Sequence, residues 1–376
     1  MRKVCYVSGT RADYGLMQNT LQAIHHHAQL NLGLMVTGMH LLSAYGDTWQ
    51  EIEKDGFNID AKVPVKLTGA EGAEMSIALG EQVIGFTKAL QQIKPDMVLL
   101  LGDRGEMLAG AISALHLNIP IVHIHGGELS GTVDESIRHA ISKLAHYHFT
   151  ATEKSRDRLI RMGEKSDTVF ITGAPGIDEI NNMKPSDREQ LFTEYGLDQT
   201  QPLLLILFHP VVQQANEVSG QIRALLDAVL EVGLNSLVIM PNADAGSSVI
   251  ASEIQRYEKK PQINTAVHVP RKDFLSFIAH AEVMVGNSSS GIIEAASLNT
   301  PVVNIGDRQR CRERSRNVLD VAPVMNDIVK AINEARQMKG EKWTNVYGEG
   351  GSAEKIVKQL LNISLSPEIM EKVNAY

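Results

Sequence analysis

The sequence lacks the features that are typical of secreted, membrane and nucleic-acid-binding proteins, since it has few cysteines, no long apolar run and little positive charge. It contains two cysteines, Cys5 and Cys311, which cannot form a disulfide framework and have no zinc-site spacing. Its longest apolar run, Leu203 to Phe208, is far shorter than the roughly 20 residues that cross a bilayer. The first residues turn polar too soon for a signal peptide. We therefore expect a cytoplasmic protein that does not associate with membranes.

Positive charge is also scarce. The formal net charge is -8, from 36 Lys and Arg against 44 Asp and Glu, which disfavours binding to nucleic acid. Arginines alternate along Arg308 to Arg316, but no aromatic residues lie between them to stack on bases. Any anionic ligand must therefore be held by local arginines and helix ends.

What the sequence does contain is a regular alternation of short apolar runs and helical patterns over its 376 residues. This alternation is typical of βαβ units around parallel sheets. We expect strands at Val4–Val7, Leu32–Val36, Ile59–Val65, Met97–Leu101, Ile121–Ile124, His148–Ala151, Leu203–Phe208, Ser236–Met240, Ala266–Val269, Val283–Val285 and Pro301–Ile305. We expect helices at Leu16–His27, Glu74–Ile93, Glu106–Leu117, Ser136–Leu144, Glu153–Met162, Val218–Val232, Ser247–Tyr257, Arg271–His280, Gly291–Ser297, Pro323–Gln337 and Ala353–Asn362.

This pattern predicts an α/β fold of two Rossmann-like, doubly wound domains that face a cleft. We assign residues 1–180 to a first domain that carries catalytic carboxylates, and residues 181–352 to a second domain. A helix within residues 353–376 is expected to pack back on the first domain. Ligands of open parallel sheets bind beyond the C-terminal strand ends, so the functional residues should follow strands.

One strand end, within Val283 to Ala296, has the features of a phosphate site. Gly286 and the sequence Asn287-Ser288-Ser289 allow a sharp turn and supply N-cap residue types before a helical pattern. Free backbone N–H groups and small hydroxyls at a helix start suit a phosphate or pyrophosphate. Glu294, one turn further, is placed to accept the two hydroxyls of a ribose. An ordinary capped helix fits the same pattern.

Strand ends in the first half carry further candidates. Arg11 lies in a small-residue loop that lacks the G-x-G-x-x-G fingerprint, which disfavours NAD. Asp103 is a candidate base and Arg104 a candidate phosphate clamp, although an N-cap with a surface partner fits equally. His123 and His125 have no third ligand at a recognised metal spacing, so acid/base or sugar-hydroxyl contacts fit better than a metal.

Strand ends in the second half are also polar. Pro210 keeps His209 out of the helical region and presents its imidazole at a strand tip. The later strand ends bring Asn242, the sequence His268-Val269-Pro270, and the turn from Gly306 to Arg308.

Together these motifs resemble those of the UDP-N-acetylglucosamine 2-epimerases, from Ser8 to Gly351. The resemblance is carried by Gly102-Asp103-Arg104, His123-Ile124-x-Gly126-Gly127-Glu128, Ser136-Ile137-Arg138-His139, His209-Pro210, Gly286-Asn287-Ser288-Ser289 and Gly306-x-Arg308. The segment from Gly127 to His148 is most similar to the hydrolysing branch, which makes N-acetylmannosamine and free UDP for sialic acid synthesis.

The resemblance implies a GT-B-like pair of domains, no cofactor, no metal and a homodimer or homotetramer. By position, it implies that UDP is held by Arg11, Arg104, His209, Asn242, Val269, Ser288, Ser289, Glu294 and Arg308. It also implies catalytic roles for Asp103 and Asp134. The third catalytic position is Glu in some hydrolysing members and His in others; here it is His125, which we expect to support the two carboxylates.

Several alternatives to a hydrolysing UDP-N-acetylglucosamine 2-epimerase stay open. The substrate of a hydrolysing enzyme can instead be UDP-N,N'-diacetylbacillosamine, of the legionaminic acid pathway, which differs at C4 and C6 of the sugar. A non-hydrolysing epimerase would retain UDP, and a GT-B glycosyltransferase would need an acceptor. A regulator without catalysis would bind UDP and leave the sugar nucleotide intact.

Overall fold

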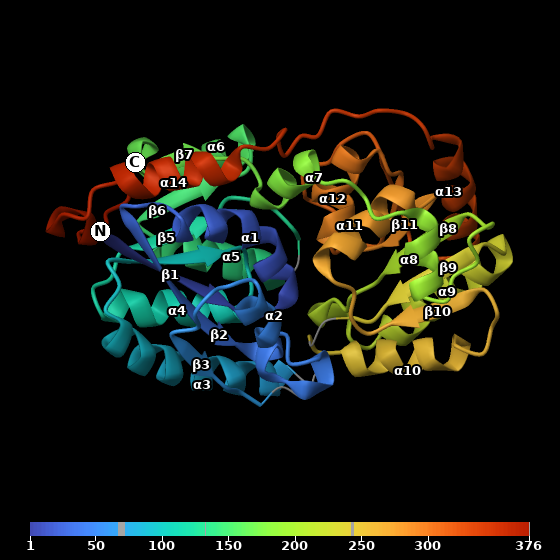
Figure 1. The fold of residues 1–376 in the computed structure, drawn as a ribbon, viewed down its shortest axis with the longest axis horizontal. Coiled ribbons are helices and arrows are strands. Elements are labelled where there is room, and N and C mark those ends of the chain that lie inside the picture. Colours follow the sequence, from blue (N-terminus) through green and yellow to red (C-terminus); the bar gives the residue numbers. More distant parts are fainter. Residues whose placement is uncertain (67–71, 132, 242–243, 376) are drawn as a thin grey trace.

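Two lobes, each built on a parallel sheet, lie side by side in the computed structural model (Figure 1). The structure describes residues 1–66, 72–131, 133–241 and 244–375. Within these ranges the sheet of the N-terminal lobe has seven strands in the order β3-β2-β1-β4-β5-β6-β7. Its strands are β1 (Arg2–Ser8), β2 (Leu30–Thr37), β3 (Ala61–Val63), β4 (Met97–Leu101), β5 (Ile121–Ile124), β6 (Tyr147–Thr150) and β7 (Val169–Ile171).

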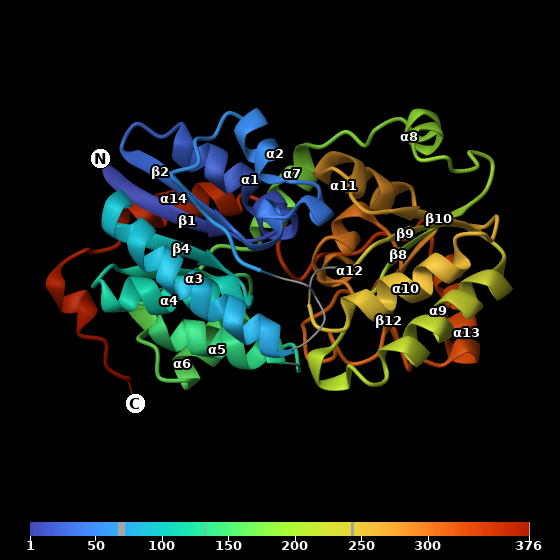
Figure 2. The ribbon, with the colours of Figure 1, turned by 90° about the horizontal axis from the view of Figure 1, so that it is seen from below.

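Helices cover both faces of this sheet (Figure 2). One face packs against α3, α4 and α5, and the other against α1, α2 and α14. The helices of the lobe are α1 (Arg11–His25), α2 (Trp49–Lys54), α3 (Gly72–Ile93), α4 (Gly105–His116), α5 (Val133–Leu144), α6 (Glu153–Arg161) and α14 (Ser352–Asn362).

The sheet of the C-terminal lobe has six strands in the described ranges, in the order β10-β9-β8-β11-β12-β13. They are β8 (Leu203–Leu207), β9 (Asn235–Ile239), β10 (Ile263–Ala266), β11 (Val283–Gly286), β12 (Val302–Ile305) and β13 (Val318–Val321). Its helices are α9 (Val218–Val232), α10 (Ser247–Tyr257), α11 (Arg271–His280), α12 (Ser289–Ile293) and α13 (Met325–Gln337). Two short helices, α7 (Asp178–Asn182) and α8 (Arg188–Glu194), lie between the two sheets in the sequence.

The central strands explain why the fold class is readable from the sequence. Every residue of β4 and β8 is buried, because helices cover both faces of each sheet, and both strands are unbroken apolar runs. Burial of one such Leu or Met side chain contributes roughly 1.5–3 kcal/mol to folding. The predicted class, two doubly wound α/β units, is confirmed.

Several predicted element boundaries are wrong. Helix α1 begins at Arg11, five residues before the predicted start at Leu16, because Thr10 and Asp13 form a capping box that starts the helix within the small-residue loop. The strand predicted at Ile59–Val65 is shorter, and that at Ala266–Val269 lies earlier, at Ile263–Ala266.

Two edge strands and the helix predicted at Gly291–Ser297 also differ from the prediction, and the short helices α2, α7 and α8 were not predicted. β7 and β13 were not predicted; each is a short strand at the edge of its sheet, with part of its surface exposed and a weak apolar signal. The helix predicted at Gly291–Ser297 is instead α12, followed by a 3-10 turn from Ala295 to Leu298.

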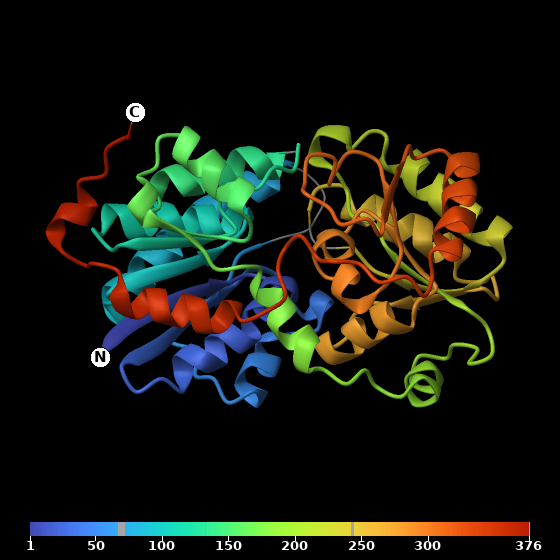
Figure 3. The ribbon, with the colours of Figure 1, turned by 90° about the horizontal axis from the view of Figure 1, so that it is seen from above.

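The C-terminal part of the chain crosses back to the N-terminal lobe, where α14 lies beside α1 (Figure 3). The Asp178 carboxylate accepts hydrogen bonds from the amides of Ser352, at 2.8 Å, and Ala353, at 2.5 Å, at the start of α14. Arg2 donates to the carbonyls of Leu360 and Ile363 at its end, both at 2.8 Å. The predicted domain boundaries at residues 180 and 352 stay a prediction. No helix in the described ranges is both long and apolar enough to span a bilayer.

Candidate active site

A cavity of about 730 Å³ lies between the two lobes and is lined by residues from both. This volume is in the usual range for a site that binds a small molecule or nucleotide. The predicted site residues within the described ranges all line it: Arg11, Asp103, Arg104, His125, Asp134, His209, Val269, Ser288, Ser289, Glu294 and Arg308. Asn242 lies outside the described residues. The roles of these residues stay predictions.

The turn after β11 brings hydroxyls and a guanidinium to one wall of the cavity. Gly286 has φ 137°, and a side chain there would collide with the Leu207 carbonyl of β8. Ser288 caps α12, and its hydroxyl accepts from the Ser290 amide at 3.3 Å. Arg308 donates to the Asn287 carbonyl at 3.1 Å and so stands beside this turn. The arrangement offers small donors and a cation to an anion.

Glu294 is held at the next turn by Arg271, which was not predicted as a site residue. Arg271 forms an ion pair with Glu294 Oε1, contacts Glu179 Oε2 at 3.2 Å, and donates to the Gly176 carbonyl at 3.1 Å. The second oxygen of Glu294, Oε2, is buried and has no hydrogen-bond partner among the described residues. A carboxylate that a cation holds through one oxygen can accept a hydrogen bond from a ligand hydroxyl with the other oxygen.

Two arginines of the N-terminal lobe reach across to the C-terminal lobe. Arg104 lies 3.0 Å from Asp244 and 3.3 Å from Glu106. Burial opposes its charge, but Asp244 and Glu106 outweigh this and raise the pKa of Arg104 well above its ordinary value. Arg11 donates to the Val267 carbonyl at 3.3 Å. Both cations line the cavity.

His209 stands at the tip of β8, as its proline neighbour predicts. Its backbone is fixed by Asn287, which accepts from the His209 amide at 2.7 Å and donates to its carbonyl at 2.8 Å. Burial, and then the nearby charge of Arg308, lower the pKa of His209 to about 3. The imidazole is therefore neutral near pH 7 and can act as a hydrogen-bonding group.

Two carboxylates, Asp103 after β4 and Asp134 in the first turn of α5, share the N-terminal wall. Burial, and then repulsion from Asp103, raise the pKa of Asp134, while Arg308 acts in the opposite direction. Arg138 is 1% exposed and forms an ion pair with Asp103. Arg138 was predicted only as part of a sequence motif, because its partner Asp103 lies 35 residues away in the chain.

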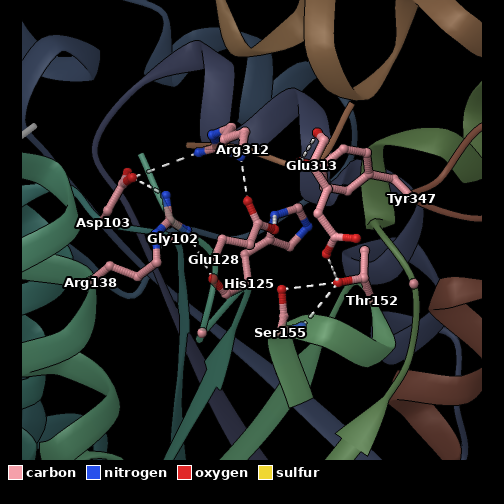
Figure 4. A network of polar contacts seen from close by, with 12 residues as sticks. Gly102, Asp103, His125, Glu128, Arg138, Thr152, Ser155, Arg312, Glu313 and Tyr347 are labelled. Atoms are coloured by element: carbon pink, nitrogen blue, oxygen red, sulfur yellow. Dashed lines mark hydrogen bonds and ion pairs between the residues drawn. The ribbon is translucent and has the colours of Figure 1, made fainter. Parts of the chain in front are cut away.

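A polar network connects this wall to the other lobe (Figure 4). His125 Nδ1 lies 2.9 Å from Glu128 Oε1. Glu128 Oε2 forms an ion pair with Arg312, which belongs to the loop between β12 and β13. Arg312 also lies 3.8 Å from Asp103. Burial opposes the charge of Glu128, but Arg312 and His125 outweigh it and lower its pKa below the ordinary range.

His123 does not join His125 in the cavity. Its ring is buried between the Gly102 carbonyl, at 2.7 Å, and the Ser142 hydroxyl, at 3.0 Å. Burial lowers the pKa of His123 well below its ordinary value. No group of three or more His, Cys, Asp or Glu within the described ranges is arranged to hold a metal ion.

Comparison with known proteins gives the same family as the motifs. The family model described as UDP-N-acetylglucosamine 2-epimerase matches residues 22–361. A protein of Legionella pneumophila named UDP-N,N'-diacetylbacillosamine 2-epimerase (hydrolyzing) is 48% identical over 376 residues, which is 100% of both chains. A protein of Neisseria meningitidis named UDP-N-acetylglucosamine 2-epimerase is 33% identical over 98% of this chain and 96% of its own.

Solved structures show the same fold. The crystal structure of UDP-GlcNAc 2-epimerase from Neisseria meningitidis, bound to UDP-GlcNAc, has a TM-score of 0.81 at 19% identity, over 96% of this chain and 100% of that one. From its family-model match and its full-length similarity to known members, this chain belongs to the UDP-N-acetylglucosamine 2-epimerase family.

Proposed function

We propose that the protein is a hydrolysing 2-epimerase of a UDP-linked 2-acetamido sugar, which releases UDP and the free C2-epimeric sugar. One observation carries this proposal. The carboxyl groups of Asp103 and Asp134 line the same cavity as the Ser288–Ser289 turn and Arg308. Carboxylates suit acid/base work on a sugar ring, and arginines suit a diphosphate.

The relatives favour UDP-N,N'-diacetylbacillosamine as the substrate. The relative that carries this name is 48% identical over its full length, and a Campylobacter jejuni protein named for the GDP or UDP form is 36% identical over 344 residues. The sequence motifs favour UDP-N-acetylglucosamine, whereas these relatives favour the diacetylated sugar, which we therefore place first. UDP-N-acetylglucosamine stays the second candidate, supported by the 33% identical relative from Neisseria meningitidis.

In the proposed complex the C-terminal lobe holds the nucleotide. Glu294 Oε2, buried without a protein partner in the described part of the chain, would accept the ribose hydroxyls. Ser288, Ser289 and Arg308 would hold the diphosphate, with Arg11 and Arg104 from the other lobe. His209, Val269 and Asn242 complete the set that the family resemblance implies, with Asn242 outside the described residues.

The proposed reaction begins with loss of UDP, because the C2 proton of the sugar is barely acidic until positive charge develops at C1. The C1–O bond breaks and its electron pair leaves with UDP, which the arginines stabilise. One carboxylate removes the C2 proton, and a C1=C2 double bond forms, giving a 2-acetamidoglycal. Water then adds at C1, and a carboxylic acid returns a proton to C2 from the opposite face. The raised pKa of Asp134 suits it to the proton-donating role.

Incubation with each UDP-sugar in deuterated water tests both the reaction and the substrate. We expect free UDP together with an epimeric sugar that carries deuterium at C2, and a higher kcat/KM for UDP-N,N'-diacetylbacillosamine. An epimer that stays attached to UDP would indicate the non-hydrolysing reaction instead. Transfer of the sugar only when an acceptor is added would indicate a glycosyltransferase, and binding of UDP without turnover would indicate a regulator.

A further inference from the structure

His125 has a backbone conformation that side-chain-bearing residues rarely adopt. Its φ is 64°, in the left-handed region. The surrounding structure holds it there: the His125 amide donates to the Phe149 carbonyl at 2.9 Å, and Arg138 donates to the His125 carbonyl at 2.8 Å. Such conformations cost free energy, persist where the surrounding structure fixes them, and cluster at active sites.

The two ring nitrogens of His125 have different surroundings. Nδ1 lies 2.9 Å from Glu128 Oε1, whereas Nε2 is buried and has no hydrogen-bond partner among the described residues. His125 also lines the cavity. The charge of Glu128, 2.9 Å away, favours a proton on Nδ1, which leaves the lone pair of the neutral ring on Nε2, since a neutral imidazole carries one proton.

The carboxylate that orients His125 is itself held from the other lobe. Glu128 Oε2 forms an ion pair with Arg312 (Figure 4), while Oε1 faces His125 Nδ1 at 2.9 Å. The loop that carries Arg312 is anchored on the N-terminal lobe by Glu313, which accepts from the Thr152 hydroxyl at 2.5 Å and lies 3.5 Å from Lys154. Since these contacts join two lobes, the orientation of His125 depends on how the lobes are placed.

We propose that His125, Glu128 and Arg312 form a relay across the cleft in which His125 Nε2 is the base for the water that adds to C1. Glu128 and Arg312 are its positioning residues. This inference rests on the proposed function. Asp103 and Asp134 suffice to remove one C2 proton and return another, so the water is the reactant that still needs a base.

The proton and electron movements of the hydration step balance. The C1=C2 electron pair takes a proton from a carboxylic acid and forms the new C2–H bond. The oxygen of the water bonds to C1, one of its O–H bonds breaks, and that proton moves to His125 Nε2. The imidazolium is stabilised by Glu128 until it loses its proton to solvent.

The variants Glu128→Gln and Arg312→Gln test the relay, with Arg310→Gln as a matched control. Gln has one acceptor oxygen and cannot serve both His125 and Arg312. Arg310 lies two positions away in the same loop, and its side chain is 67% exposed. Single-turnover experiments should follow released UDP and released reducing sugar separately, and 15N NMR of the labelled His125 ring should report its tautomer.

We expect both test variants to slow sugar formation by about 100-fold or more while UDP release and the KM for the UDP-sugar change little. The tautomer population of His125 should move away from the Nδ1–H form in Glu128→Gln and stay unchanged in Arg310→Gln. The relay is overturned if sugar formation and the tautomer stay as in the wild type, or if UDP release falls as much as sugar formation.

The same measurements separate this inference from the proposed function. If the wild-type protein releases UDP from neither sugar nucleotide, the proposed function is wrong, whatever the tautomer of His125. If the wild type hydrolyses its substrate and the two variants do so at the wild-type rate, only the relay is wrong. Thermal unfolding of each variant checks that a loss of rate does not come from a loss of fold.

Discussion

Arg308 of the C-terminal lobe lies 3.9 Å from Asp134 of the N-terminal lobe, measured from Nη2 to Oδ2. The same guanidinium donates to the Asn287 carbonyl, at the start of the Ser288–Ser289 turn. A diphosphate bound at this turn would compete with Asp134 for one cation. Withdrawal of Arg308 removes an interaction that lowers the pKa of Asp134, and so favours the protonated, proton-donating form of that carboxyl.

Replacement of Arg308 by Gln should weaken UDP binding by about 10- to 100-fold, because a hydrogen bond to a charged group is worth roughly 1.5–3 kcal/mol. Isothermal titration with UDP measures this effect directly. Arg310→Gln, in the same loop but exposed and paired with Asp307, should bind UDP like the wild type. Equal affinity of Arg308→Gln and the wild type would place the diphosphate elsewhere.

Replacement of Asp103 by Asn should lower kcat by about 10²- to 10⁴-fold, the usual contribution of a general acid or base. UDP affinity should change little, because Asp103 lies on the wall opposite the Ser288–Ser289 turn. Asp157→Asn is a control on α6, where the side chain is 57% exposed. Unchanged turnover in Asp103→Asn would remove this carboxylate from the mechanism.

Glu294 should give the protein a preference for ribose over 2'-deoxyribose. We expect the wild type to bind UDP about 10-fold or more tightly than 2'-deoxy-UDP, since the buried carboxylate loses one of the two hydrogen bonds that it accepts from the ribose. Glu294→Gln should reduce this ratio towards one. Glu179→Gln, which removes the other carboxylate bound to Arg271, should keep the preference. Competition binding with the two nucleotides measures the ratio, and a wild type that binds both equally would contradict the assignment.

Glu164, which pairs with Lys372 near the C-terminus, makes the stability of the fold depend on pH in the acid range. Glu164 lies 2.7 Å from both Lys143 and Lys372 and 3.0 Å from His148. Burial opposes its charge, but hydrogen bonds from His148, Lys143 and Lys372 outweigh it and lower the pKa of Glu164 to about 2. A carboxyl whose pKa is lower in the folded state stabilises the fold above its unfolded pKa, and this stabilisation is lost as the pH falls through the folded pKa.

Glu164→Gln should therefore destabilise the protein by roughly 3 kcal/mol at pH 7, an order-of-magnitude figure from about 1.4 kcal/mol per pKa unit. The difference from the wild type should shrink between pH 4.5, the ordinary value, and pH 2. Urea unfolding at several pH values checks this. Glu231→Gln, exposed on α9, should change the free energy of unfolding by less than about 0.5 kcal/mol at any pH. A pH-independent effect of Glu164→Gln would contradict the charge-based explanation.

Much of the candidate site could be found from the sequence because it follows strands. Asp103, His125 and His209 come directly after buried apolar runs, and the C-terminal ends of parallel strands meet at one edge of each sheet. Ser288 and Ser289 were recognisable as N-cap residue types before a helix. Local patterns of this kind need no knowledge of distant partners.

Arg271, Arg312 and Glu128 were not recognisable in their present roles. Arg312 and Glu128 are 184 residues apart in the chain, and an arginine in an arginine-rich loop has the sequence signature of a solvated cation. Arg271 appeared only as the first residue of a predicted helix, while its contacts with Glu294 and Glu179 depend on how three segments meet. The edge strands β7 and β13 were missed for a related reason, since partial burial weakens their apolar pattern.

The sequence by itself determined the α/β class, the alternation of elements and the strand ends at which reactive side chains appear. This is because strands that are buried on both faces of a parallel sheet consist of consecutive apolar residues. Only the tertiary structure decided which charges meet: Arg308 with Asp134, Arg312 with Glu128, and Arg271 with Glu294. Ion pairs of this kind act over a few ångströms in space and leave no periodic trace along the chain, so they become visible only when the fold brings distant segments together.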